Sequence, residues 1–469
     1  MENIDYLIRG GIVVNSNFEK QADVAIQGEK IVAVTEPNTI KNAKEIIYAS
    51  GCYVLPGAID THTHFEEPFQ GCVPNEDWGA GTRAACIGGT TFVFNFVIQS
   101  KNLSLTEDIA NHKARASALS YIDFNFHGVF TNLKDMESNL KEIEGIIDGG
   151  VSSFKEFMIY TEEGLAVDDW NLMLIMKEIT KRGGILGVHA ENCSIGENLT
   201  KAIAASGKID AKYWPLAKPN FVEAEAVNRA FMIAEYTNSN IYIVHTSTHE
   251  AVDLIGKYKY GNNFFLETCP HYLTFTKDKY LDEDGKYQVI SPPLRDKEDL
   301  EELWKGLANG RVSFIGSDHN AYGKESKDPG YAESGFMGVA NGQPGVFEII
   351  TVVYNEGVRK NRIDMSRLVE ITSTNAAKIF GIFPKKGIIA PGSDADIVIF
   401  DPNKKETLGF KWYEQADTSF YEGMEVVGFP KMTIVKGTVV AKEGKIIQKE
   451  PNGKFVPSTV RANMYQGIS

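Results

Sequence analysis

The sequence is poor in cysteine and has no hydrophobic run long enough to cross a membrane. Its 469 residues include five cysteines, an odd number with no Cys-x-x-Cys pair, which argues against a disulfide framework and against a cysteine-based zinc site. The longest mostly apolar stretch, residues 90–98, is far shorter than the roughly 20 residues of a spanning helix. The first residues, MENIDYLIRG, show no basic region of a signal peptide. We therefore expect a cytoplasmic protein.

Positive charge is also in short supply. The chain has 48 Lys and Arg against 62 Asp and Glu, a formal net charge of −14. Proteins that bind nucleic acids or anionic membrane surfaces need a basic face, so we expect neither partner. No Gly-x-Gly-x-x-Gly motif follows a strand-like segment, which argues against a doubly wound dinucleotide-binding sheet. The 43% hydrophobic and 23% charged residues are typical of a globular chain.

Short apolar segments alternate with amphipathic ones through most of the chain. A capping box at 104–107 and apolar faces at 172–179, 227–234 and 300–307 indicate helices between the strands. Eight strands in alternation with helices predict an α/β fold of the (β/α)8 TIM barrel type. The expected strands are 53–60, 91–98, 122–130, 151–158, 185–190, 241–246, 263–269 and 312–318.

The two ends of the chain differ from this pattern. Residues 1–52 and 387–450 contain short β-rich runs with glycine turns, which we expect to pair into one small β-sandwich. The predicted barrel then occupies residues 53–386. The tail, residues 451–469, is polar and rich in Gly and Pro, and we expect it to be weakly specified and available for packing on a neighbouring subunit.

Metal-binding side chains recur where the predicted barrel strands end. The active sites of such barrels lie at this face. His62 and His64 are two residues apart on one strand, so their side chains point the same way. A single strand-end histidine is more often structural, but the set as a whole favours metal binding, and it exceeds the need of one tetrahedral ion, which suggests two metals. The set comprises His62, His64, His189, His245 and Asp318.

The remaining histidines have no such arrangement. We interpret them as structural residues: His112 on a helix, His127 in the third strand, His249 in a loop and His319 beside Asp318. The role of His271 is left open.

Lys155 lies in the middle of the apolar segment Phe154-Lys-Glu-Phe-Met158. Burying a charged ammonium is costly, so the side chain is either paired or snorkelling, or it has a lowered pKa and is neutral. A neutral amine can capture carbon dioxide as a carbamate. A carbamate has two oxygens and can therefore bridge two cations.

Motifs along nearly the whole chain resemble the cyclic amidohydrolases, most closely the dihydropyrimidinase/hydantoinase branch. The matching stretches are Gly57-Ala-Ile-Asp-Thr-His-Thr-His64, Pro68-Phe-Gln-Gly71, Gly88-Gly-Thr-Thr91, Ser153-Phe-Lys-Glu-Phe-Met158 with Tyr160, Val188-His-Ala-Glu-Asn192, Val244-His-Thr-Ser247, Glu267-Thr-Cys-Pro270, Ser291-Pro-Pro-Leu-Arg295, Gly316-Ser-Asp-His319, Asn341-Gly342 with Pro344-Gly345, and Gly392-Ser-Asp-Ala-Asp-Ile397.

The resemblance implies a zinc hydrolase that opens the ring amide of cyclic ureides, dihydropyrimidines or 5-substituted hydantoins, to N-carbamoyl amino acids. It implies two zinc ions bridged by a hydroxide and by Lys155 as N6-carboxylysine. Tyr160 would stabilise the oxyanion, Asp318 would act as general acid and base, and the backbone of Ser291 and Asn341 would bind the ring. A homotetramer is implied as well. The implied metal ligands are His62, His64, Lys155, His189, His245 and Asp318.

Some positions depart from this branch and keep alternatives open. Relatives acting on dihydroorotate or allantoin carry an arginine where this chain has Glu66, and a glutamate would repel a substrate carboxylate. Conversely, Cys269-Pro-His-Tyr-Leu273 looks more like the allantoinase or dihydroorotase version of that strand end. Asn320 and Phe347-Glu348-Ile349 also differ from the usual Cys and Glu-x-Arg. The alternatives are an allantoinase and a non-catalytic scaffold of the same fold.

Overall fold

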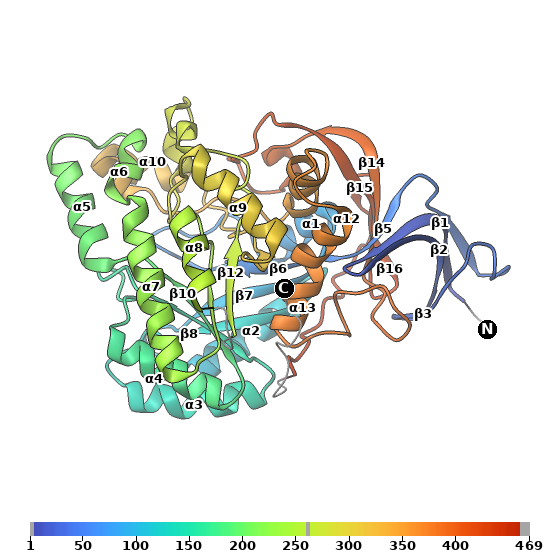
Figure 1. Cartoon of the computed structure of the whole chain (residues 1–469), viewed down its shortest axis with the longest axis horizontal. Coiled ribbons are helices and arrows are strands. Elements are labelled where there is room, and N and C mark those ends of the chain that lie inside the picture. Colours follow the sequence, from blue (N-terminus) through green and yellow to red (C-terminus); the bar gives the residue numbers. More distant parts are fainter. Residues whose placement is uncertain (1–3, 259–262, 460–469) are drawn as a thin grey trace.

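The computed structural model describes residues 4–258 and 263–459 (Figure 1). Within them, eight strands follow one another around a parallel barrel in chain order. The ring closes beyond the last strand, where the His319 N–H donates to the His62 carbonyl at 3.1 Å and the His64 N–H to the His319 carbonyl at 2.9 Å. This confirms the predicted TIM barrel. Its strands are β6 (Ala58–Thr63), β7 (Thr90–Ile98), β8 (Asp123–Val129), β9 (Ser153–Phe157), β10 (Ile185–His189), β11 (Ile241–Ile243), β12 (Phe264–Thr268) and β13 (Phe314–Ile315).

A second sheet combines strands from both ends of the chain, seen in blue and red-orange at the right of Figure 1. β5 pairs with both β1 and β14 and so joins the two halves. Buried residues from both halves, such as Val24, Val54, Ile397 and Ile434, form one apolar cluster. The predicted terminal β-sandwich is confirmed. Its strands are β1 (Tyr6–Asn15), β2 (Phe18–Gln27), β3 (Lys30–Thr35), β4 (Glu45–Tyr48), β5 (Tyr53–Pro56), β14 (Ile397–Thr407), β15 (Glu425–Val435), β16 (Thr438–Lys442) and β17 (Lys445–Ile446).

The expected first barrel strand, residues 53–60, is divided into two strands. Tyr53–Pro56 pairs in the terminal sheet, and the barrel begins at Ala58. Gly57 lies between them, and a Cβ atom there would come within 2.1 Å of the Thr91 side chain. The chain therefore changes sheets at a glycine that packs directly on β7. The limits 1–52, 53–386 and 387–450 otherwise stay predictions. β5 falls within the predicted barrel range but pairs in the terminal sheet.

The four predicted helices are present, and helices cover the outside of the barrel in Figure 1. The capping box opens α2, because Ser104 and Glu107 each bind the other's backbone N–H. The described α-helices are α1 (Trp78–Gly88), α2 (Leu105–Leu119), α3 (Met136–Asp148), α4 (Asp169–Lys181), α5 (Cys193–Ala205), α6 (Trp214–Ala217), α7 (Asn220–Thr237), α8 (His249–Tyr258), α9 (Lys297–Asn309), α10 (Lys324–Ser334), α11 (Ile349–Val353), α12 (Met365–Val369) and α13 (Asn375–Ile379).

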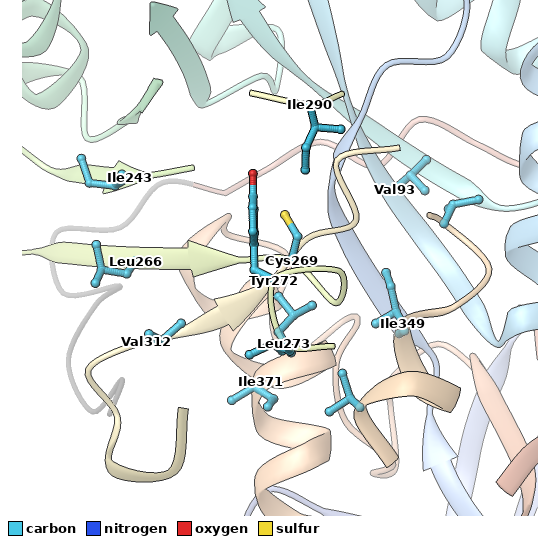
Figure 2. Packing of buried hydrophobic residues seen from close by; sticks show 14 of the residues in the cluster. Val93, Ile243, Leu266, Cys269, Tyr272, Leu273, Ile290, Val312, Ile349 and Ile371 are labelled. Carbon is cyan, nitrogen blue, oxygen red and sulfur yellow. The ribbon is translucent and has the colours of Figure 1, made fainter. Parts of the chain in front are cut away.

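Alternation along the strands produces two cores. On β7, Phe92, Phe94 and Phe96 belong to the cluster inside the barrel, whereas Val93 and Val97 belong to the cluster that packs against the helices. Figure 2 shows the outer cluster, with side chains from neighbouring strands beside those of the segments that follow them. The aromatic interior holds the barrel strands in place, so their carboxyl ends form a fixed rim for side chains.

The first part of the tail binds its own barrel. The Phe124 N–H donates to the Lys454 carbonyl at 3.1 Å, and the Val456 N–H donates to the Phe124 carbonyl at 3.0 Å. The Asn125 amide donates to the Val456 carbonyl at 2.7 Å. Residues 451–459 are therefore well specified within the subunit, contrary to the expectation of a loose tail. Residues 460–469 lie outside the described part of the chain.

Among residues 4–258 and 263–459, no helix combines the length and the apolar character needed to cross a membrane.

Candidate active site

The two histidines of β6 meet the aspartate that follows β13. His62 Nε2 lies 3.0 Å and His64 Nε2 3.6 Å from the same oxygen, Asp318 Oδ1. The spacing of two residues therefore turns both imidazoles to one side, as the sequence predicts. Asp318 has a φ of +54°, an uncommon conformation for a non-glycine residue, and it is held at the point where the barrel closes.

Three more predicted ligands complete the cluster from β9, β10 and the segment after β11. His189 Nδ1 and His245 Nε2 are 2.9 Å apart, and the His245 ring centroid is 5.3 Å from that of His62. Lys155 Nζ lies 3.4 Å from His62 Nε2 and sits over the rings of two phenylalanines. All of these side chains are buried. The structure thus brings together the six residues expected as ligands.

Glu267 on β12 supports two of these histidines. Its Oε1 atom is 2.6 Å from His62 Nδ1 and accepts the His245 N–H at 3.0 Å, and its Oε2 accepts the Thr61 hydroxyl at 2.7 Å. A carboxylate that binds the far nitrogen fixes the tautomer and direction of a ligating imidazole. The sequence analysis assigned no role to this residue. Its signal was a carboxylate inside a buried apolar strand, as with Lys155.

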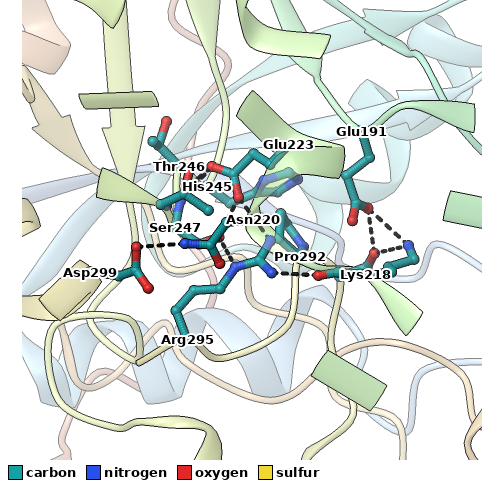
Figure 3. A network of polar contacts seen from close by, with 12 residues as sticks. Glu191, Lys218, Asn220, Glu223, His245, Thr246, Ser247, Pro292, Arg295 and Asp299 are labelled. Atoms are coloured by element: carbon teal, nitrogen blue, oxygen red, sulfur yellow. Dashed lines mark hydrogen bonds and ion pairs between the residues drawn. The ribbon is translucent and has the colours of Figure 1, made fainter. Parts of the chain in front are cut away.

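A second buried carboxylate, Glu191, orients His189 from the other side of the site. Its Oε2 is 2.7 Å from His189 Nε2, 2.9 Å from Lys218 Nζ and 2.6 Å from Ser291 Oγ. Figure 3 shows the contact with Lys218. Burial alone would raise the pKa of Glu191, but the Lys218 charge and the His189 contact hold it well below its usual value. Figure 3 also shows Arg295 reaching the main-chain oxygen of Lys218. Lys218 was missed because it lies between predicted elements.

Burial controls the charge of the site. It lowers the pKa of His64 to about 3 and that of His189 to about 4, and it holds the pKa of His245 well below its usual range. Burial also lowers the pKa of Lys155 to about 8, against the opposing charges of Asp318 and Glu267. Although burial opposes it, the contact with His62 keeps the pKa of Asp318 well below its usual value. Three neutral imidazoles therefore face a carboxylate.

A cleft opens over this cluster and is lined by the expected substrate-binding residues Tyr160, Ser291 and Asn341. Tyr160 has a φ of +77°, and its ring contacts those of Phe69 and His189. Burial raises the pKa of its hydroxyl well above its usual value. The Asn341 N–H donates to Gln70 Oε1 at 3.0 Å, which ties two loops of the cleft together.

Glu66, which the sequence analysis considered for substrate choice, does not line this cleft. Its carboxylate forms an ion pair with Arg115 on α2 at 2.9 Å. The neighbouring Glu67 lines the cleft instead. The loop after β6 turns at Glu66, whose φ is +58°, and Glu67 is therefore the acidic side chain of this loop that lines the cleft.

The other histidines have structural partners. His127 lies in the barrel interior and contacts Ser153 Oγ at 2.7 Å and the Thr61 carbonyl at 2.9 Å. His319 Nε2 is 3.1 Å from Glu76, and His112 Nε2 is 3.3 Å from Glu67. His249 is the first residue of α8 rather than part of a loop. His271, left open by the sequence, is buried against the ring of Phe420.

The donor set fits a metal centre. One imidazole nitrogen each of His62 and His64 and an oxygen of Asp318 all lie within 4.8 Å of one another. Among the described residues, the buried His245 Nδ1 has no hydrogen-bond partner. Neutral imidazole and carboxylate are the ligands that divalent transition metals take, and metal binding requires them deprotonated.

Comparisons with known proteins agree with this geometry. Residues 53–440 match the amidohydrolase family model. The chain belongs to the amidohydrolase family. This amidohydrolase is 37% identical to a D-hydantoinase of Geobacillus stearothermophilus over 96% of each chain, and 36% identical to a dihydropyrimidinase of Rattus norvegicus over 96% of this chain and 88% of the relative. These matches place it in the hydantoinase branch.

Solved structures of the same branch share its fold. A D-hydantoinase from a Bacillus species superimposes with a TM-score of 0.93 at 38% identity, covering 97% of this chain and all of the other. An L-hydantoinase from Arthrobacter aurescens superimposes with a TM-score of 0.90 at 30% identity over 97% of this chain. Relatives named for opposite stereochemistry thus have nearly the same fold as this amidohydrolase.

Proposed function

We propose that this protein is a metal-dependent hydrolase that opens the ring amide of cyclic ureides, either 5,6-dihydropyrimidines or 5-substituted hydantoins. Water adds across the amide: the C–N bond breaks, the hydroxyl joins the carbonyl carbon and a proton joins the nitrogen, which gives an N-carbamoyl amino acid. The observation that carries the proposal is the convergence of four imidazoles, a lysine and an aspartate under one cleft. Similarity to hydantoinases across 96% of the chain supports it.

The residues that would hold two zinc ions are His62, His64, His189, His245, Asp318 and a carboxylated Lys155. The lowered pKa of Lys155, about 8, makes a neutral amine accessible near physiological pH. Its nitrogen would form a bond to carbon dioxide with loss of one proton, and the resulting carbamate would offer two oxygens. When bound, the metals would acidify a water molecule and polarise the amide carbonyl.

The chain's own residues would position the ring and move the proton. The Tyr160 hydroxyl stays protonated, because burial raises its pKa, and it would donate a hydrogen bond to the amide oxygen as negative charge develops there. Asp318 would take the proton of the attacking water and deliver it to the leaving nitrogen. Because the Asn341 N–H already donates to Gln70, we assign its carbonyl, with the backbone of Ser291, to the ureide groups.

The proposal is tested by metal analysis and a ring panel. Purified protein, supplied with zinc and bicarbonate, should carry about two zinc ions per chain and should open dihydrouracil or hydantoin. Loss of ring absorbance and mass spectrometry of the product would monitor the reaction. Preference for allantoin in the parallel assay would replace the substrate assignment with an allantoinase. If the protein binds no metal and leaves dihydrouracil, hydantoin and allantoin intact, the enzyme assignment is wrong and the protein is a scaffold.

We also propose a cytoplasmic homotetramer, which rests on the family resemblance. Light scattering of the purified protein tests the subunit number, and a monomer at micromolar concentration would contradict it.

A further inference from the structure

Two buried oxygen atoms at the cleft lack hydrogen-bond partners. Glu67 and Asn320 both line the cleft, and they are only 4% and 6% exposed. Among the described residues, His112 Nε2 comes within 3.3 Å of Glu67 Oε1, but no contact with hydrogen-bond geometry reaches that atom or Asn320 Oδ1. Buried polar atoms are nearly always paired, because an unpaired one costs free energy. A ligand group that donates hydrogen bonds would satisfy both.

The orientation of the Asn320 amide follows from its neighbours. The Tyr322 hydroxyl donates to the Glu67 main-chain carbonyl at 3.1 Å, so it accepts the Asn320 Nδ2–H at 2.9 Å. Reversing the amide would set an acceptor against the Tyr322 oxygen, whose proton is already used. Tyr322 therefore leaves the carbonyl oxygen of Asn320 as the unpartnered atom, and it links Asn320 to the loop that carries Glu67.

The groups around Glu67 carry an excess of negative charge. His112 Nε2 lies 3.3 Å from Glu67 Oε1, and burial lowers the pKa of that imidazole. Asp108 and Glu66 both raise the pKa of Glu67, in addition to the larger effect of burial, and Arg115 is paired with Glu66. Further negative charge is therefore disfavoured on this side of the cleft, which should accept a neutral donor or a cation more readily than an anionic substituent.

Apolar side chains surround these acceptors. Phe69, Ile98 and Phe157 line the same cleft. An alkyl substituent on the ring could occupy this space, but it would leave the buried oxygens unpaired. A site built around hydrogen-bonding groups discriminates strongly against an analogue that lacks the donor.

We propose that Glu67 and Asn320 form a subsite that selects cyclic ureides whose ring substituent carries a hydrogen-bond donor, a hydroxyl or an ammonium, over alkyl isosteres. The inference rests on the proposed function, since it concerns the substituent of the ring that this site opens. The two residues are specificity determinants and take no part in breaking the amide bond.

Isosteric hydantoin pairs test the proposal. The first pair is 5-hydroxymethylhydantoin and 5-ethylhydantoin, and the second is 5-(4-aminobutyl)hydantoin and 5-pentylhydantoin, with unsubstituted hydantoin as the reference. In at least one pair the donor member should have a kcat/KM about tenfold or more above its isostere. The first pair reports a neutral donor and the second a cationic one. Equal or faster turnover of the alkyl member in both pairs would overturn the proposal.

Substitutions then locate the effect. In Glu67→Leu and in Asn320→Leu, the ratio of kcat/KM for the donor member to kcat/KM for the alkyl member should fall toward one. Each kcat/KM is first divided by the value for unsubstituted hydantoin in the same variant. Glu67→Gln keeps a hydrogen-bond acceptor of the same size, so it tests the subsite even if Glu67→Leu does not fold. This variant should lose the preference for the ammonium substrate and keep part of the preference for the hydroxyl substrate. Glu137→Gln is the matched control, because that carboxylate is exposed on α3 and paired with Lys141, and it should leave the ratio unchanged.

Two failures remain distinguishable. Wild-type protein that opens no ring, unsubstituted hydantoin included, refutes the proposed function. Wild-type protein that opens hydantoin but shows the same donor-to-alkyl ratio as Glu67→Leu and Asn320→Leu refutes only the subsite.

Discussion

Single buried side chains at this site depend on their neighbours for their charge. Lys155 is surrounded by ring faces and an imidazole, and its pKa falls through burial, whereas Lys218 is equally buried but contacts the carboxylate of Glu191. The same residue type therefore serves two purposes in one site. Lys218 holds a histidine in place through Glu191, and Lys155 is the residue that we propose to be carboxylated.

Replacing Lys155 with alanine should empty the site of metal and reduce turnover to below about one per cent, because the anionic bridge between the metals is lost. Metal analysis and the ring-opening assay on the same preparation would measure this. Lys181→Ala, on the exposed surface of α4, is the control and should keep both properties. Retention of both metals at a near-normal rate in Lys155→Ala would disprove the carbamate.

Tyr160→Phe should lower kcat by about a hundredfold with metal content unchanged, the usual cost of removing one oxyanion donor. The structural reason is that the hydroxyl is buried in the cleft and its raised pKa keeps it a donor throughout the working range. Steady-state kinetics and zinc analysis separate this from a folding defect. An unchanged kcat would remove Tyr160 from the mechanism.

At the scale of elements, glycines set how closely helices and strands approach. Gly88 ends α1 against the main chain of Phe347, and a Cβ atom would lie 2.1 Å from that carbonyl oxygen. Gly145, inside α3, has no atom within 4 Å of the corresponding position. A side chain therefore has no room at Gly88 but meets open space at Gly145.

Substituting alanine at these two glycines should change stability in opposite directions. Gly88→Ala should lower the free energy of unfolding by about 1–3 kcal/mol, because the methyl group overpacks against backbone. Gly145→Ala should raise it by up to about 1 kcal/mol, because alanine favours the helix at no steric cost. Urea unfolding monitored by circular dichroism measures both. Similar shifts for the two variants would contradict the packing argument.

At the scale of the whole molecule, a buried charge cluster fastens the barrel to the terminal sheet. Lys386 lies 2.7 Å from Asp123 on β8 and close to Asp394 and Asp396 just before β14. Lys436, between β15 and β16, reaches Asp123 at 2.7 Å. Burial would raise the pKa of Asp394, but the Lys386 charge and its neighbours lower it from 3.8 to about 2.

This cluster predicts acid sensitivity. Because the folded-state pKa of Asp394 lies below 3.8, its contribution to stability is complete above about pH 4 and is lost as the pH falls toward 2. Lys386→Met should cost about 3–5 kcal/mol at neutral pH, since it removes the ion-pair partner of the buried Asp396 and one partner each of Asp123 and Asp394. The difference in stability from wild type should narrow near pH 3 as these carboxylates protonate. Urea midpoints at both pH values measure this.

Lys141→Met removes an exposed ion pair and serves as the control, with a difference near zero at both pH values. A Lys386→Met gap that does not change with pH would contradict the cluster's role.

Much of the fold could be predicted because its signals are local. Alternating and helical hydrophobic patterns located the barrel strands and four helices. The two-residue spacing of His62 and His64 placed both imidazoles on one side of the strand. The division of residues 53–60 at Gly57 was missed, because an apolar run looks the same whichever sheet receives it. The roles of Glu267, Glu191 and Lys218 were missed because their partners are distant in the chain.

The sequence by itself determined the barrel, the terminal sandwich and the set of candidate metal ligands, since each depends on residue type and short-range spacing. Only the tertiary structure decided which of two adjacent glutamates lines the cleft, how residues 451–459 bind the barrel, and which buried acceptors lack partners. These outcomes depend on loop conformation and on contacts between residues tens to hundreds of positions apart, and no local pattern encodes such distances.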